Sequence, residues 1–178
     1  MKGAILMLVL ALPGAARAQA LLRDSFDGTD GPVNGAIWHV TSGQWRIAGR
    51  RAYSDSAVFR ADTRRTNFAD VDVSFTVVNQ GLTTGDGEPW HGVHMFLRRQ
   101  SEFHTYYLSV NRRDNRALIK KKVPGGPSNG GTYYDLASAS FPVPYGRAQR
   151  VLGRVRNNPD GSVGVTLYVD GRVIASAV

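Results

Sequence analysis

Apolar and polar residues alternate with a period of two along most of this chain. The pattern is clearest at 70–77, 93–98 and 162–169. Such alternation is typical of β-strands that bury one face and expose the other. After the first 20 residues, no segment has the apolar spacing of an amphipathic helix. The alternation therefore predicts an all-β protein.

Short turn-forming segments separate the predicted strands. They are rich in Gly, Pro, Asn and Asp and lie at 85–89, 124–131, 158–161 and 170–171. Many short strands joined by such turns indicate an antiparallel sandwich or barrel. The 178 residues contain neither an internal repeat nor a linker, so we expect one domain from residue 21 to residue 178.

The first 20 residues have the layout of a secretory signal peptide. Lys2 precedes an apolar run from Ala4 to Leu12, and small-x-small cleavage sites follow at 16–18 and 18–20. The run is too short for a membrane span, which needs roughly 20 apolar residues. The sequence therefore predicts a protein that is secreted or periplasmic and has no membrane span.

The charge balance after signal removal is basic. Without Lys2 and Arg17, 20 of the 22 basic residues remain against 14 acidic ones, a net charge of +6. This excess favours anionic partners at long range, although solubility alone explains it equally well. For an exported protein we expect an anionic glycan as the partner and no nucleic acid, and we expect a monomer. The chain has no cysteine, which excludes disulfides and thiolate metal sites.

A resemblance to a known family rests on several short segments. They are 24–28 (DSFDG), 38–40 (WHV), 43–47 (GQWRI), 52–54 (AYS), 68–73 (FADVDV) and 165–173 (VTLYVDGRV). Their order resembles the concanavalin A-like lectin/glucanase superfamily, in particular its laminin-G-like and 3-keto-disaccharide-hydrolase-like domains. The resemblance covers essentially all of 21–178 and implies a two-sheet antiparallel jelly-roll sandwich. Members usually continue with a strand that pairs beside the opening one at 24–28, so we expect that this chain lacks its C-terminal closing strand or keeps the opening strand at a sheet edge.

A predicted hairpin at 90–111, with its turn near Gln100-Ser101, is the most informative segment for function. Side-chain parity places one set of its residues on the solvent face, and the next strand adds two lysines. In jelly-roll folds such a face commonly holds a glycan, with rings against the sugars and cations against carboxylates. The alternatives are an ordinary solvated face and, for the tryptophan in the loop before the hairpin, a lid over the core. The candidate carbohydrate-binding residues are Trp90, His94, Phe96, Arg98, Tyr107, Asn111, Lys120 and Lys122.

Catalysis is a second interpretation of the same face. Glucanases of the superfamily carry Glu-x-Asp-x-x-Glu on one strand, whereas this chain has only Glu88 and Glu102, both in or near loops. A polysaccharide lyase needs a base, an acid and a group that neutralises a uronate carboxylate. The candidate catalytic residues for such a reaction are His94, Tyr107, Arg98 and Asn111. We expect a carbohydrate-binding domain, with a lyase or hydrolase and a laminin-G-like adhesion or structural module as alternatives.

Metal ligands are sparse in the sequence. His91 and His94 are three residues apart on a strand and so point to opposite faces, which disfavours a histidine metal site. Asp24, Asp27 and Asp30 are close enough in sequence for a calcium site, or they are turn-forming carboxylates. We expect no other cofactor.

Overall fold

A computed structural model describes residues 20–54, 58–81 and 87–178. The predicted signal peptide, apart from Ala20, and residues 85–86 of the predicted loop lie outside these ranges. The described residues contain strands and no helix. Within the described part of the chain no helix is long and apolar enough to cross a membrane. The prediction of an all-β protein is confirmed.

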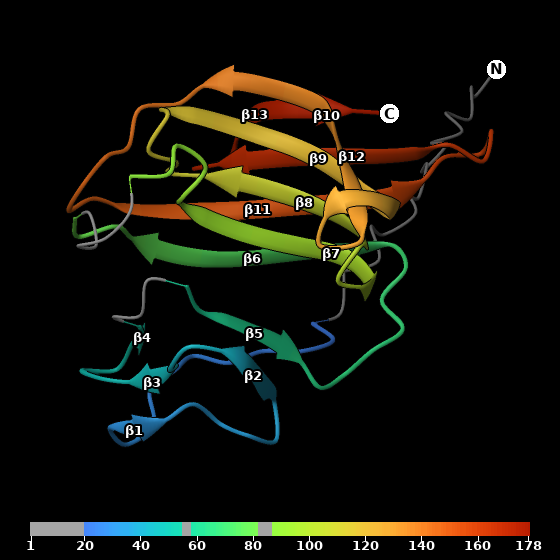
Figure 1. The fold of residues 1–178 in the computed structure, drawn as a ribbon. Helices are drawn as coiled ribbons and strands as arrows, with labels where there is room; N and C mark the ends of the chain where they lie inside the picture. The colour runs from blue at the N-terminus through green and yellow to red at the C-terminus, as the bar shows by residue number, and fades with distance from the viewer. Residues whose placement is uncertain (1–19, 55–57, 82–86) are drawn as a thin grey trace, which may run out of the picture.

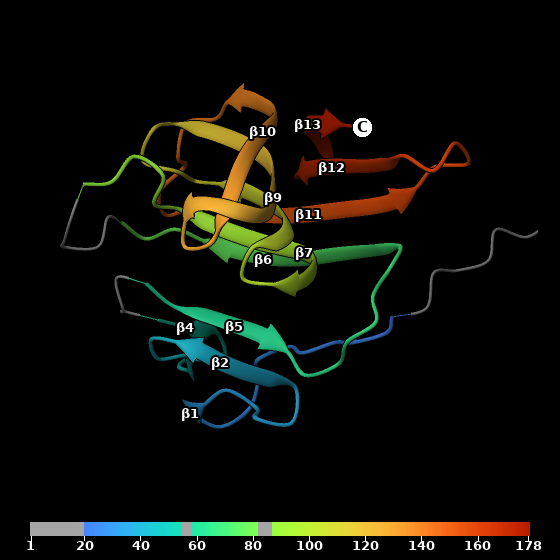
Figure 2. The same cartoon turned by 45° about the vertical axis from the view of Figure 1, so that its right-hand side comes forward.

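Two four-stranded antiparallel sheets form the body of the protein (Figure 1). Sheet I has the order β10-β9-β8-β7, and sheet II has the order β13-β12-β11-β6. The strands of sheet I are β7 (Val93–Ser101), β8 (His104–Val110), β9 (Arg116–Ser128) and β10 (Gly131–Ser140). Those of sheet II are β6 (Val71–Val78), β11 (Ala148–Asn157), β12 (Val163–Val169) and β13 (Arg172–Ala177). The two sheets pack face to face as a β-sandwich (Figure 2).

The core lies between the two sheets and consists of the apolar half of the alternating pattern. In sheet I, Met95 pairs with Leu108 and Val93 with Val110, so both strands turn the same parity inwards, as predicted. Because antiparallel partners always share a face, these pairs make one apolar layer against sheet II. Its main buried members are Met95, Leu97, Leu108, Val110, Ala117, Ile119, Val151, Val155, Val165, Leu167, Val169 and Ala175.

The N-terminal segment forms two smaller sheets beside this sandwich. One contains β1 (Gly31–Pro32), β3 (Arg46–Ile47) and β4 (Ala52–Tyr53), and the other pairs β2 (Trp38–Ser42) with β5 (Arg60–Thr63). In Figure 1 they lie below β6 and β7. Ion pairs from Arg60 to Glu102 (2.5 Å) and from Arg99 to Asp62 (3.2 Å) connect β5 to the β7–β8 hairpin.

The expected opening strand at 24–28 is absent. Phe26 has a positive φ of 53° and packs on Trp38, with 5.8 Å between ring centroids. The Asp24 carboxylate accepts hydrogen bonds from the Phe26 backbone N–H (2.9 Å) and from Trp38 Nε1 (2.8 Å). An Asp side chain that bonds the backbone two residues on makes a local turn, and this competes with strand pairing.

One glycine marks a close approach of the two sheets. Gly153 of β11 faces Met95, Leu97 and Leu108, and a Cβ atom at this position would collide with Met95 Sδ and lie 3.0 Å from Leu108 Cδ2. We expect Gly153→Val to lower the free energy of unfolding by about 1–3 kcal/mol, because overpacking forces core side chains off their rotamers. Urea denaturation measures this loss.

Gly164→Val is the matched control on the neighbouring strand. A Cβ atom at Gly164 would meet nothing closer than the Asn158 side chain at 3.6 Å. We expect this variant to change the free energy of unfolding by less than about 0.5 kcal/mol. Equal losses for the two glycines would contradict the close approach at Gly153.

Candidate functional site

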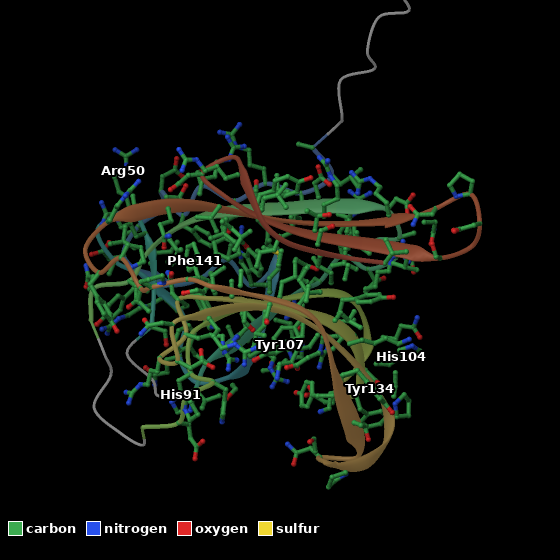
Figure 3. The ribbon with its side chains drawn as sticks, turned by 90° about the horizontal axis from the view of Figure 1, so that it is seen from above. Arg50, His91, His104, Tyr107, Tyr134 and Phe141 are labelled. Carbon is green, nitrogen blue, oxygen red and sulfur yellow. The ribbon has the colours of Figure 1, made fainter. Side chains whose placement is uncertain are left out.

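The outer face of sheet I is concave and carries aromatic and basic side chains. Seen from above, the β9–β10 hairpin bends away from the sandwich, and Tyr107 lies inside the bend (Figure 3). Strand register brings the members of this face together: Phe96 pairs with Tyr107, Tyr107 with Lys120, and Lys122 with Tyr133. We use the term concave face for Trp90, which lies three residues before β7, and for the sheet I residues His94, Phe96, Tyr107, Ser109, Lys120, Lys122 and Tyr133.

A continuous series of aromatic rings crosses the concave face. Ring centroids are 6.5 Å apart for Trp90 and His94, 4.8 Å for His94 and Tyr107, and 6.0 Å for Tyr107 and Tyr133. Phe96 adds an edge contact to Tyr107 at 4.9 Å. Trp90 and Tyr133, the two ends of the series, are 44% and 40% exposed. The series therefore offers open ring surfaces at both ends and a buried ring in the middle.

Cations surround these rings. The ammonium groups of Lys120 and Lys122 lie 5.7 Å and 4.9 Å from the Tyr133 ring centroid, and the Arg60 guanidinium lies 5.4 Å from that of Phe96. A cation near an aromatic face is stabilised by the ring quadrupole. The concave face therefore combines ring surfaces with positive charge.

His94 is a neutral member of this face. Burial, followed by the nearby charges of Arg112, His91 and Lys120, lowers the pKa of His94 to about 3. Its Nδ1 lies 3.0 Å from Ser109 Oγ. At neutral pH the ring is therefore uncharged, and it can exchange hydrogen bonds with sugar hydroxyls.

Tyr107 keeps its phenolic proton. Burial, followed by the neighbouring Tyr133, raises the pKa of Tyr107 well above its usual value. A phenol in this state can donate a hydrogen bond but is a poor base at neutral pH. Since His94 is also a weak base, neither residue is suited to abstracting a proton at neutral pH.

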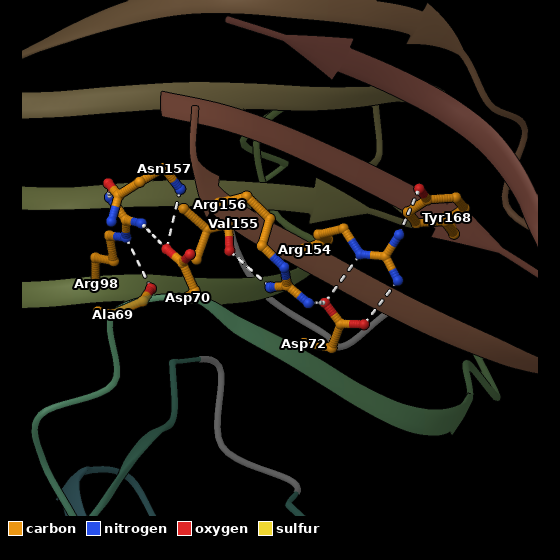
Figure 4. A network of polar contacts seen from close by, with 9 residues as sticks. All are labelled: Ala69, Asp70, Asp72, Arg98, Arg154, Val155, Arg156, Asn157 and Tyr168. Atoms are coloured by element: carbon orange, nitrogen blue, oxygen red, sulfur yellow. Dashed lines mark hydrogen bonds and ion pairs between the residues drawn. The ribbon is translucent and has the colours of Figure 1, made fainter. Parts of the chain in front are cut away.

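Arg98 does not lie on the concave face, so its expected position was wrong. The β7–β8 register shifts between Leu97 and Ser101, Arg98 has a positive φ of 48°, and Ser101 pairs with His104 rather than forming the turn. A bulge of this kind re-aims the side chain and ends the strict alternation. The Arg98 guanidinium instead donates to the Ala69 carbonyl (2.9 Å), Asp70 (2.8 Å) and Asn157 (3.0 Å) (Figure 4).

Asn111 is also displaced from its expected place. It follows the last residue of β8 with a positive φ of 52°, which takes it out of the strand alternation. The residue is 2% exposed, and neither atom of its amide has a hydrogen-bond partner among the described residues. Asn111 therefore does not present its side chain to solvent on this face.

Three contributors were missed by the sequence reasoning. Arg112 is buried, pairs with Asp114 (2.5 Å), and lies close enough to His94 and Tyr107 to shift the pKa of both. Arg60 comes from β5 in the N-terminal segment, and Tyr133 comes from β10. Only Tyr133 left a local signal, an aromatic pair shortly after the Gly-rich segment 124–131, which was predicted as a turn and in fact lies mostly in β9. The other two depend on tertiary contacts.

Comparison with known proteins gave no relative. No family model, no curated protein and no solved structure matches this chain. The function of this chain is therefore inferred from its own geometry.

The three aspartates considered for calcium do not form a site. Asp24 accepts its two hydrogen bonds from Phe26 and Trp38, and Asp30 Oδ1 accepts one from the Gly49 backbone N–H (3.0 Å). Among the described residues, no three His, Asp or Glu side chains are grouped so that they could hold a metal ion. Asp24 and Asp30 therefore act as turn and backbone partners.

A second charged cluster lies on the outer face of sheet II (Figure 4). Asp72 of β6 accepts hydrogen bonds from Arg154 (2.8 and 3.0 Å) and Arg156 (2.6 Å) of β11. The hydrogen bond from Arg154, with the charges of both arginines, lowers the pKa of Asp72 despite some desolvation. This cluster joins two neighbouring strands on the side of the sandwich opposite the concave face.

The cluster predicts an acid-dependent contribution to stability. Because the folded-state pKa of Asp72 is lowered, its contribution is present above the unfolded-state pKa, about 3.9, and is lost as pH falls through the folded-state value. We expect Asp72→Asn to lower the Tm at pH 7. At about pH 2 the Tm difference between the variant and the wild type should be smaller, because the contribution of Asp72 is then lost. Thermal melts across this range check the prediction, and a constant difference at every pH would contradict it.

Proposed function

We propose that this chain is a secreted carbohydrate-binding domain of the concanavalin A-like, jelly-roll kind, which holds an acidic polysaccharide along the concave face of sheet I. The observation that carries the proposal is the ring series from Trp90 to Tyr133, flanked by Lys120, Lys122 and Arg60. Rings offer flat apolar surfaces for the C–H faces of sugars, and cations pair with carboxylates.

Binding is favoured over catalysis by the state of the polar groups. His94 and Tyr107 both have pKa values shifted away from those of a general base at neutral pH. Asp70, Asp72 and Glu102 are bound to arginines. Among the described residues, the concave face lacks the pair of free carboxylates that a glycosidase needs.

A binding and turnover assay tests the proposal. Exported protein is mixed with polyuronates and with neutral polymers, and we follow its Tm and the ultraviolet absorbance of unsaturated sugar ends. We expect a higher Tm with an acidic polymer and no product, since a ligand stabilises the state that binds it. Release of unsaturated ends that is lost in Tyr107→Phe would indicate a lyase instead. Neither a Tm shift nor a product would favour the adhesion module.

A further inference from the structure

Lys122 is buried within the concave face. The residue is only 4% exposed, although it lies on a β9 position whose parity points away from the core. Its stem lies over Gly131, where a Cβ atom would come within 2.7 Å of Lys122 Cε and 2.6 Å of Phe103 Cβ. Because Gly131 has no side chain, the Lys122 stem fits over it. The Lys122 ammonium lies 4.9 Å from the centroid of the Tyr133 ring.

Lys122 differs from the other cations of the site in its pairing. Lys120 pairs with Asp135 (3.1 Å), Arg60 with Glu102 (2.5 Å) and Arg112 with Asp114 (2.5 Å). Within the described residues, Lys122 has neither a carboxylate within 4.0 Å nor a hydrogen-bond partner. Its ammonium makes a cation–π contact with the Tyr133 ring. The ammonium is not fully buried, so an anion can reach it. Such an anion would form the charge-assisted contact that no carboxylate of the described residues supplies.

We infer that Lys122 is the anion subsite of the concave face: it binds the carboxylate or sulfate of an acidic sugar whose ring stacks on Tyr133. The inference rests on the proposed function and assigns charge recognition to one residue. The three paired cations need not release their carboxylates for the ligand to bind. The site should therefore prefer a charged polymer to the same polymer with its acid masked, and the preference should depend on Lys122.

The test compares polygalacturonate with its fully methyl-esterified form, which has the same backbone without the charge. Lys122→Met keeps an unbranched stem over Gly131 and removes the ammonium. We expect this variant to bind polygalacturonate roughly tenfold more weakly, the effect of losing one charge-assisted contact, and to bind the ester as well as the wild type does. Lys120→Met, at a cation whose charge Asp135 already compensates, should weaken polygalacturonate binding less than Lys122→Met does. Dextran sulfate, as a third polymer, distinguishes carboxylate from sulfate. If Lys122→Met also binds dextran sulfate more weakly than the wild type does, the subsite accepts both groups. If only its binding to polygalacturonate is weaker, the subsite accepts carboxylate alone.

Two further variants keep the inference separate from the proposed function. Lys121→Met removes an exposed lysine of opposite parity on the same strand and should bind like the wild type. Lys122→Gln is a second neutral variant that replaces Lys122→Met if the latter fails to fold. If wild-type protein binds polygalacturonate and neither Lys122 variant weakens it, the inference fails and the proposed function stands. If wild-type protein binds neither an acidic nor a neutral polymer, the proposed function itself fails.

Discussion

Replacing Leu108 with alanine is expected to lower the free energy of unfolding by about 2–5 kcal/mol. Leu108 is 1% exposed in β8, the second strand of sheet I from the β7 edge, and pairs with Met95. Gly153 of sheet II faces Leu108 and has no side chain that could move into the cavity. Urea denaturation with an unchanged m-value measures the loss, and the Tm should fall by roughly 5–15 °C for a chain of this size.

Leu136→Ala is the matched control for this prediction. Leu136 is a β10 leucine that is 37% exposed, and it loses the same atoms on substitution. We expect a loss of less than about 1 kcal/mol, because little apolar surface returns to water and no enclosed cavity forms. Similar losses for the two leucines would mean that the core does not lie between the two sheets at Leu108.

The parity of the β7–β8 hairpin could be predicted from the sequence because it depends on local alternation alone. Val93, Met95 and Leu97 alternate with His94 and Phe96, and antiparallel pairing carries the same parity into β8. This was enough to place His94, Phe96 and Tyr107 on one face. Lys120 and Lys122 followed because β9 pairs next to β8.

Strand parity does not predict the face of a residue where the backbone leaves the β region. Arg98 and Asn111 both have positive φ, and each follows the last regular residue of its strand segment. A residue with φ above zero is uncommon outside glycine and breaks the period of two, so counting from His94 gives the wrong face for Arg98. Asn tolerates this conformation better than most residues, which was a weak signal at Asn111 and none at Arg98.

The burial of polar side chains on the concave face could not be predicted either. Alternation placed Tyr107 and Lys122 on a solvent face, yet both are buried. The cause is the bend of the β9–β10 hairpin, which brings Gly131 and Tyr133 over Lys122. Such a bend depends on contacts between residues far apart along the strands, and alternation contains no information about it.

Removing both open rings of the concave face is expected to weaken polysaccharide binding roughly a hundredfold. Trp90→Ala and Tyr133→Ala each delete a half-exposed ring at opposite ends of the series, with His94 and Tyr107 between them. A stacked ring contributes about 1.5 kcal/mol at most beyond its buried area, or roughly tenfold in affinity, and two separated sites add nearly independently. Isothermal titration with the polymer that raises the Tm of the wild type measures the loss.

Tyr134 supplies the matched control, because it is the next residue along β10 and points the other way. It pairs with Lys121, whereas Tyr133 pairs with Lys122, and it is 52% exposed. Trp90→Ala/Tyr134→Ala removes rings from the same two segments but takes only one from the concave face, so it should lose only about tenfold in affinity. All three substituted residues are half-exposed, so neither double variant should lose much stability. If the two double variants bind equally weakly, the ligand does not follow the ring series, and the concave face is not its binding site.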